Sequence, residues 1–302
     1  MSKVIWIQQL INFKHAWFAL LFLASSTVFY FSLPNPPFPL FSLDAIKTLI
    51  LGGIAFFVAR SLGMIVNQIV DCAIDKRNPR TQMRVLPAEL LSIKHSMLLV
   101  FFCFILFVSF CWFFNPLCFI LAVLVSLLMI VYPYTKRFTF LCHWILGLVY
   151  YFAILMNFFA IAPVPSFSIF CMASLLGLSF GMIIAANDII YAIQDLEFDR
   201  KEGLFSVPAC FGTQFSIKMA SANLAISALA YLFLGYFVLD RMMFYLCSFL
   251  PLAEIFRTIK RYTCINLSSP AELQQKFFLG NLSLGIAFLA NMIGLFLLGG
   301  TS

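Results

Sequence analysis

The chain has 302 residues, of which 63% are hydrophobic and only 10% carry a formal charge, and its mean hydropathy is +1.01. Soluble domains average about 25% charged residues, so a water-soluble globule of this size could not bury so much apolar surface. The composition therefore predicts an integral membrane protein, and continuous rather than alternating apolar runs argue against a β-barrel. We expect residues 1–302 to form a single helical domain.

Nine apolar stretches follow one another along the chain, each long enough to form a membrane-spanning helix. They cover residues 15–33, 46–70, 95–114, 117–134, 141–162, 167–194, 215–238, 242–259 and 277–299. Prolines interrupt several of the connections, for example at Pro116 and Pro163. The expected fold class is therefore all-α, a polytopic membrane protein with nine transmembrane helices.

Lysine and arginine residues concentrate at the N-terminus and in alternate connections between these stretches. They are Lys3, Lys14, Lys76, Arg77, Arg80, Arg84, Lys94, Lys136, Arg137, Arg200, Lys201, Lys260, Arg261 and Lys276. The positive-inside rule places the N-terminus and these loops in the cytoplasm and the C-terminus outside. The same rule explains the formal charge of +7, so nucleic acid is not expected as a partner.

Acidic residues are scarce, twelve in all, and five of them are aspartates in two short segments. Each segment spaces its polar residues three or four positions apart, so that a helix presents them on one face. The first stripe comprises Asn67, Asp71 and Asp75, and the second comprises Asp188, Tyr191, Asp195 and Asp199. A single aspartate at a helix end is often only solvated, but two such stripes on one side of the membrane indicate a shared site.

Carboxylates stacked on one helix face repel each other and need counter-charge, which lysine and arginine supply only in part. A divalent cation is the more natural partner, and oxygen ligands favour Mg²⁺, which completes its shell with water and phosphate oxygens. The candidate metal ligands are Asn67, Asp71, Asp75, Asp188, Asp195 and Asp199. A diphosphate is the expected second ligand. Four basic residues of nearby loops fit this ligand, namely Arg80, Arg84, Lys136 and Arg137.

The histidines and cysteines, which could bind a metal or act as nucleophiles, lack a recognisable spacing. His95 and His143 do not form a metal pair, and we interpret the first as interfacial and the second as a packing residue. Most of the nine cysteines lie within apolar runs, where a free thiol behaves as a small hydrophobic side chain. The sequence contains no zinc, Ser-His-Asp or phosphate-loop motif.

The two stripes read NxxxDxxxD and DxxYxxxDxxxD, and they resemble the UbiA superfamily of intramembrane prenyltransferases. NPRT at 78–81, RVLP at 84–87, YPYTKRFT at 132–139 and DRKEGLFSVPACFG at 199–212 extend the resemblance over most of the chain. The chain departs from the family pattern in two places. Gln68 stands where aspartate is frequent, and the RPLP stretch has Val85 as its second residue and Glu89 in place of the glycine that often follows.

The resemblance implies nine helices around a central cavity and Mg²⁺-dependent transfer of a polyprenyl group from its diphosphate to an aromatic acceptor. It implies catalytic roles for Asp71, Asp75, Asp195, Asp199 and Tyr191 and substrate binding by Asn67, Arg60, Arg80, Arg84, Lys136 and Arg137. Tyr191 would face the allylic cation or bond a carboxylate, unless it packs between helices. Arg60 is the candidate for the acceptor's carboxylate, and pairing with another helix is its alternative.

Within the superfamily, NPRT and QDLEFDRKEGLFSVP are most similar to bacterial 4-hydroxybenzoate polyprenyltransferases. This similarity implies an inner-membrane enzyme of ubiquinone or menaquinone biosynthesis that works among membrane lipids. The alternative acceptors in the superfamily are 1,4-dihydroxy-2-naphthoate and haem. A cation-coupled transporter is the alternative outside it, but transporter sites lie near the bilayer midplane, whereas these acids lie at cytoplasmic helix ends.

Overall fold

The structure, a computed structural model, describes residues 3–11, 16–264 and 270–299, and this part of the chain is helical, without a β-strand. Lys14 lies outside the described residues, and so do the side chains of Lys3 and Lys276. The helices are α1 (Lys3–Leu10), α2 (Ala16–Phe31), α3 (Leu43–Asp75), α4 (Ile93–Phe114), α5 (Pro116–Thr135), α6 (Cys142–Ile161), α7 (Phe167–Ala192), the 3₁₀ turn η2 (Ile193–Asp195), α8 (Leu196–Glu202), α9 (Val207–Leu234), α10 (Arg241–Cys247), α11 (Phe249–Thr263) and α12 (Pro270–Gly299).

Eight segments of the described chain form helices that are long and apolar enough to cross a membrane. A ninth helix, α2, is apolar over Ala19–Phe31 but shorter. One of the eight segments consists of α10 and α11 together, and in another α7 continues through η2 into α8. Each predicted stretch thus corresponds to one helix or helix pair. The predicted all-α, polytopic fold is confirmed, and the chain is a multi-pass integral membrane protein.

Side-chain caps fix where several of these helices begin. Ser42, Ser92, Asn115, Ser166 and Ser206 each accept a hydrogen bond from the backbone N–H three residues further along. Such caps satisfy N–H groups that have no partner within the helix. Ser206 is followed by Pro208 in the first turn, where a missing N–H costs little, so α9 begins at Val207 rather than at the predicted residue 215.

α6 and α7 cross at two glycines. A Cβ added at Gly147 would lie 2.6 Å from the carbonyl oxygen of Gly181, and a Cβ added at Gly181 would lie 2.6 Å from that of Gly147. Small residues allow membrane helices to approach this closely, because no side chain separates their backbones. The crossing holds the first turns of α6 close to the second half of α7.

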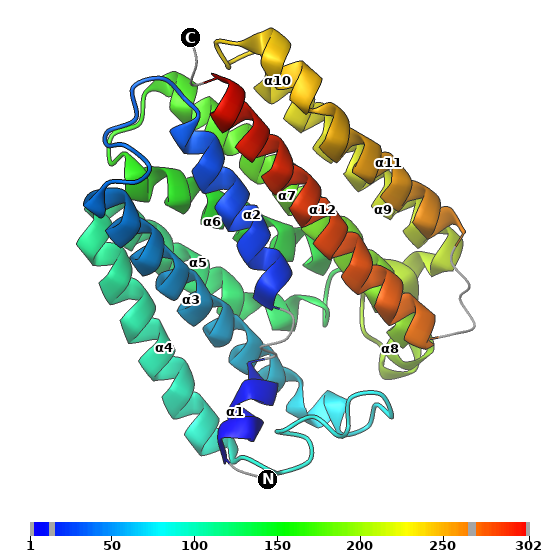
Figure 1. Cartoon of the computed structure of the whole chain (residues 1–302). Coiled ribbons are helices and arrows are strands. Elements are labelled where there is room, and N and C mark those ends of the chain that lie inside the picture. Colours follow the sequence, from blue (N-terminus) through cyan, green and yellow to red (C-terminus); the bar gives the residue numbers. More distant parts are fainter. Residues whose placement is uncertain (1–2, 12–15, 265–269, 300–302) are drawn as a thin grey trace.

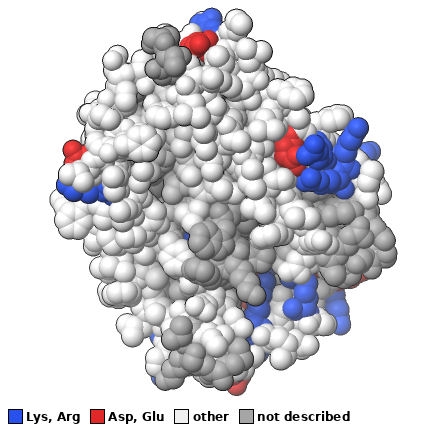
Figure 2. Space-filling model, viewed as in Figure 1, with Lys and Arg blue, Asp and Glu red and all other residues white. Residues whose placement is uncertain are grey.

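The helices surround a cavity of about 330 Å³ that has walls from α2 to α7 and from α12. In Figure 1, α3, α4 and α5 form one side of the bundle, α9, α11 and α12 form the other, and α2 lies between them. Figure 2 shows a largely uncharged face, as expected of a surface in contact with lipid, with charged side chains gathered toward its edges. The central cavity implied by the resemblance is therefore present.

Candidate active site

Apart from Arg60, which lies in the middle of α3, the predicted site residues come from three segments at one end of the bundle. The segments are the end of α3 with the loop 76–92, the loop 136–141 between α5 and α6, and the end of α7 with η2 and α8. Figure 1 shows α8 and the loop after α3 at the same end as α1. The backbone N–H of Phe205 donates to the carbonyl oxygen of Lys136 at 2.6 Å, which ties the second segment to the third.

The aspartates of the first stripe are each paired with a basic residue. Asp71, whose side chain is 4% exposed, accepts a hydrogen bond of 2.7 Å from Nζ of Lys136. Oδ2 of Asp75 accepts a bond of 2.9 Å from Arg84, and its Oδ1 accepts one of 2.7 Å from the Thr81 hydroxyl. These partners offset part of the cost of burying a carboxylate.

Arg80 is the cation of the second stripe. Its Nε donates to Oδ1 of Asp195 at 2.8 Å, its Nη2 donates to Oδ2, and its Nη1 donates to the Tyr191 hydroxyl at 3.0 Å. Asn78 adds an amide N–H to Asp195 at 3.0 Å. Burial alone would lower the pKa of Arg80, but its bonds with Asp195 and Tyr191 raise that pKa above the ordinary value. The guanidinium therefore stays charged and oriented.

The second stripe does not lie on one uniform α-helix, and this part of the prediction is wrong. α7 ends at Ala192, η2 follows, and α8 begins at Leu196. A 3₁₀ turn is tighter than an α-helical turn, so the spacing across it differs from that of an α-helix. Asp188, Asp195 and Asp199 lie on three elements, although Arg80 bonds both Tyr191 and Asp195 across the turn.

The partners of Asp188 and Asp199 are a histidine and a serine. Nδ1 of His143 lies 2.7 Å from Oδ2 of Asp188, and the Ser206 hydroxyl donates to Oδ2 of Asp199 at 3.0 Å. The His143 side chain is buried, but the packing role predicted for it is incomplete, because the ring also supports a candidate metal ligand. Ser206 combines its bond to Asp199 with its role as the N-cap of α9.

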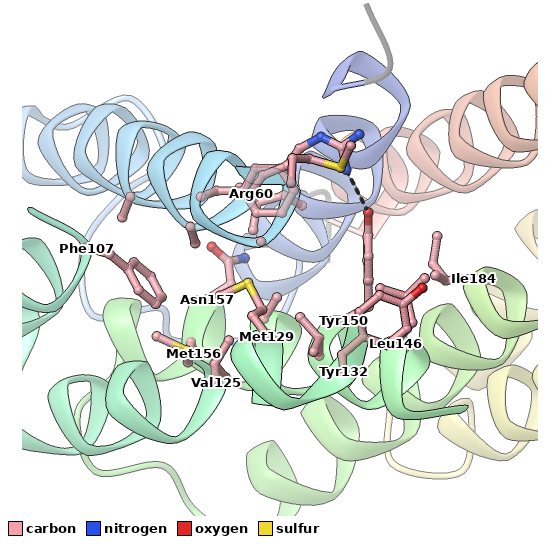
Figure 3. A pocket seen from close by; sticks show the side chains of 18 of the residues that line it. Arg60, Phe107, Val125, Met129, Tyr132, Leu146, Tyr150, Met156, Asn157 and Ile184 are labelled. Atoms are coloured by element: carbon pink, nitrogen blue, oxygen red, sulfur yellow. Dashed lines mark hydrogen bonds between the residues drawn. The ribbon is translucent and has the colours of Figure 1, made fainter. Parts of the chain in front are cut away.

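The cavity extends from these groups into an apolar interior. Four predicted site residues line its charged end, namely Asn67, Arg84, Asp188 and Tyr191. Most of the remaining wall is apolar and includes Phe107, Val125, Met129, Leu146, Met156 and Ile184 (Figure 3). Within this wall, Arg60 donates a hydrogen bond of 3.4 Å to the Tyr150 hydroxyl, drawn as a dashed line in Figure 3.

Arg137 lies beside the first stripe but bonds its backbone rather than a carboxylate. It donates to the backbone carbonyl of Val70 at 2.8 Å, and its guanidinium carbon lies 5.1 Å from the centroid of the Tyr134 ring. Within the described part of the chain, Arg137 forms no ion pair with an aspartate. The cations that touch the stripes are Arg80, Arg84 and Lys136.

The carboxylates suit a metal ion that arrives with phosphate. Among residues 3–11, 16–264 and 270–299, no three His, Cys, Asp or Glu side chains gather closely enough to hold a metal ion by themselves. Mg²⁺ usually takes one or two protein carboxylates and fills its shell with water and phosphate oxygens. Oδ1 of Asp71 is buried and has no hydrogen-bond partner in the described structure, so this oxygen is suited to a cation. The donor set therefore fits Mg²⁺.

Several residues that hold the site give little signal in the sequence. Asn78, Thr81, His143 and Ser206 each hydrogen-bond one of the five aspartates. Asn78 and Thr81 belong to the NPRT stretch, which supports the family resemblance but does not by itself indicate a partner for either residue. The contact of His143 with Asp188 spans 45 positions and depends on the crossing of α6 and α7, so spacing does not indicate it.

Comparison with known proteins gives a consistent assignment. The UbiA prenyltransferase family matches residues 19–282 of the chain. A 4-hydroxybenzoate octaprenyltransferase from Francisella tularensis subsp. novicida (strain U112) is 33% identical over 242 residues, which cover 75% of this chain and 80% of the relative.

Two solved structures share the fold. The apo structure of a UbiA homolog from Aeropyrum pernix K1 has a TM-score of 0.78 at 24% identity. The match covers 93% of this chain and 97% of the homolog's chain. The structure of a UbiA homolog from Archaeoglobus fulgidus bound to GPP and Mg²⁺ has a TM-score of 0.69 at 20% identity. The match covers 96% of this chain and 99% of the homolog's chain.

Proposed function

The chain belongs to the UbiA prenyltransferase family, and we propose that it transfers a polyprenyl group from polyprenyl diphosphate to 4-hydroxybenzoate with Mg²⁺ as cofactor. The observation that carries this proposal is an apolar cavity with Asn67, Arg84, Asp188 and Tyr191 at one end. Arg84 pairs there with Asp75, and the Tyr191 hydroxyl accepts from Arg80, which holds Asp195. A polyprenyl chain suits the apolar wall, and its diphosphate suits the charged end. The Francisella relative is named for this acceptor, and the Archaeoglobus neighbour was solved with GPP and Mg²⁺.

The charged end supplies the oxygen ligands that Mg²⁺ prefers. The residues that would hold the ion are Asn67, Asp71, Asp75, Asp188, Asp195 and Asp199. When bound with the diphosphate, Mg²⁺ stabilises the negative charge that builds on the leaving group. The buried Oδ1 of Asp71, which has no hydrogen-bond partner in the described structure, supports this assignment.

Arg80, Arg84 and Lys136 are placed to bind the diphosphate. Each of them holds an aspartate of the two stripes, and each carries donors that form charge-assisted bonds with phosphate oxygens. As the carbon–oxygen bond breaks and the electron pair leaves with the diphosphate, these cations neutralise the growing charge. Arg137 lies next to them, with one N–H bonded to the carbonyl of Val70.

Loss of the diphosphate leaves an allylic cation, and an electron-rich ring carbon of the acceptor attacks it before losing its proton. The apolar wall keeps water away from this cation. The ring of Tyr191 borders the cavity and stabilises positive charge through its π face. Arg60 lies in the same wall beside Tyr150, where its guanidinium is suited to the carboxylate of the acceptor.

The charge distribution supports a cytoplasmic site in the inner membrane. Loops 76–92 and 136–141 carry most of the basic residues near the site, and the positive-inside rule assigns such loops to the cytoplasm. α1 lies at this end of the bundle, and the last turn of α12 lies at the opposite end (Figure 1). The acceptor and the diphosphate group then reach the site from the cytoplasmic side, while the prenyl chain remains among lipids.

The test is a transfer assay with purified protein in detergent, Mg²⁺, a polyprenyl diphosphate and labelled 4-hydroxybenzoate. We expect the wild type to form prenylated product and D71A to lose at least about 100-fold in rate, because it removes a ligand and a partner of Lys136. D44A is the matched control, since Asp44 lies at the other end of α3 and forms an exposed pair with Lys47.

The acceptor is tested in the same assay. Product with 1,4-dihydroxy-2-naphthoate or haem, but not with 4-hydroxybenzoate, would show that the acceptor is wrong while prenyl transfer stands. Absence of product with all three acceptors would refute the proposed reaction.

A further inference from the structure

His143 and Asp188 form a hydrogen bond behind the cavity wall, and the reaction scheme above assigns no role to the histidine. Their Nδ1 and Oδ2 atoms are 2.7 Å apart. The His143 side chain is 3% exposed, whereas the Asp188 side chain is 25% exposed and lines the cavity. The ring therefore supports the carboxylate from the side away from the substrates. The close crossing at Gly147 and Gly181 brings α6 and α7 near enough for this contact.

Val207 determines which nitrogen of the ring carries the proton. Val207 is the first residue of α9, and its N–H has no acceptor inside the helix. It donates instead to Nε2 of His143 at 3.3 Å. A ring nitrogen that accepts a hydrogen bond carries no proton, so the proton of the neutral ring is on Nδ1. Hydrogen bonds consequently run in one direction, from Val207 through His143 to Asp188.

Asp188 also differs from most of the other aspartates in the type of its partner, which is a histidine rather than a lysine or an arginine. Asp71, Asp75 and Asp195 are each paired with a lysine or an arginine. Within the described residues, no lysine or arginine forms an ion pair with Asp188, and its recorded partner is the imidazole of His143. The ring therefore fixes one oxygen of the Asp188 carboxylate, and the 25% of this side chain that stays exposed lines the cavity.

We propose that His143 is a positioning residue that holds the Asp188 carboxylate toward the cavity for metal binding, in the tautomer that Val207 imposes. This inference rests on the proposed function, because it takes Asp188 as a ligand of Mg²⁺. Groups that hydrogen-bond a metal ligand set its orientation, and their loss typically costs about 10- to 100-fold in metal affinity or activity.

The test measures Mn²⁺ binding by electron paramagnetic resonance, with an unreactive prenyl thiodiphosphate and no acceptor. H143L fills the same space but removes both hydrogen bonds, and we expect it to weaken Mn²⁺ binding about 10- to 100-fold. H143N keeps an N–H near the position of Nδ1, so it should restore most of the affinity. H95L is the matched control, because His95 lies exposed at the start of α4, and it should bind Mn²⁺ like the wild type.

A double-mutant cycle separates positioning from a general effect on folding. If His143 acts through Asp188, the H143L/D188N protein binds Mn²⁺ no more weakly than D188N alone. Additive losses, or wild-type affinity in H143L, would overturn the proposal, as would failure of H143N to recover affinity while it melts like the wild type. A wild type that binds Mn²⁺ and the analogue but does not prenylate 4-hydroxybenzoate refutes the proposed acceptor and leaves the role of His143 intact.

Discussion

The variant K136M tests whether the pairing of Lys136 with Asp71 contributes separately to stability and to catalysis. Methionine keeps much of the length of the lysine side chain but removes the ammonium group, which lies 2.7 Å from Oδ2 of Asp71. The Asp71 side chain is 4% exposed, and its Oδ1 has no hydrogen-bond partner within the described residues. K136M therefore leaves a buried carboxylate without its cation.

The expected loss of stability follows from the burial of this pair. Removing one partner of a buried ion pair costs about 3–5 kcal/mol. Lys136 is 26% exposed, so water screens part of the charge that remains, and we expect the lower end, about 3 kcal/mol. At roughly 2–4 °C per kcal/mol, the melting temperature falls by about 6–12 °C. Loss of a cation that faces the leaving diphosphate also lowers kcat by about 100-fold.

The double variant K136M/D71N separates the two effects. Asparagine removes the charge that needs a partner, so the double variant should recover most of the melting temperature and remain inactive. Unfolding is followed with a thiol-reactive fluorophore, because the buried Cys72, Cys111 and Cys118 become accessible when the helices separate. A double variant as unstable as K136M would refute the electrostatic reasoning, and wild-type turnover by K136M would refute the role at the leaving group.

Three further variants test packing, acceptor binding and the second stripe. G181A places a Cβ 2.6 Å from the carbonyl oxygen of Gly147, and we expect about 1–3 kcal/mol of lost stability, seen as a lower melting temperature. R60L should raise KM for 4-hydroxybenzoate about 10- to 100-fold, since a bond to a charged group contributes about 1.5–3 kcal/mol, with KM for the polyprenyl diphosphate unchanged. Y191F removes the hydroxyl that accepts from Arg80 at 3.0 Å, and kcat should fall about tenfold without a change in melting temperature.

Controls for these variants come from the same chain and the same assay. G52A adds a Cβ with no atom within 4 Å, so it should melt like the wild type. A phenol without a carboxylate should show the same KM in R60L and in the wild type. An unchanged melting temperature in G181A would contradict the packing assignment, and equal KM changes for both substrates in R60L would contradict the acceptor assignment.

Hydropathy identifies the spans because each membrane crossing needs a nearly continuous apolar run, and lipid imposes this requirement on every helix separately. The stretch at 242–259 shows a feature that hydropathy averaged over a whole span does not reveal. The chain there forms α10 and α11, which meet at Ser248, and α11 buries Glu254 against Arg257 and Arg261. The pairing satisfies a charge that an average over the stretch does not reveal.

Spacing predicts the first stripe well because α3 runs without a break from Leu43 to Asp75. It is less accurate for the second stripe, because η2 interrupts the α-helical period between Ala192 and Leu196. The partner of each aspartate depends on which helices cross, and that information is in the tertiary packing. The spacing of polar residues therefore indicates that a site exists, whereas the hydrogen bonds within it can be assigned only from the folded structure.

Three of the five aspartates of the site are paired with a lysine or an arginine, and this has a consequence for the order of binding. Diphosphate alone would draw Lys136, Arg80 and Arg84 away from their aspartates and leave buried carboxylates without partners. A metal ion that takes these aspartates as ligands would leave the same cations without partners. Bound together, the two ligands replace every broken pair. Metal and diphosphate should therefore each raise the affinity of the other by the same factor, which titration calorimetry measures in both orders. Independent binding of the two would show that the internal pairs persist in the loaded site.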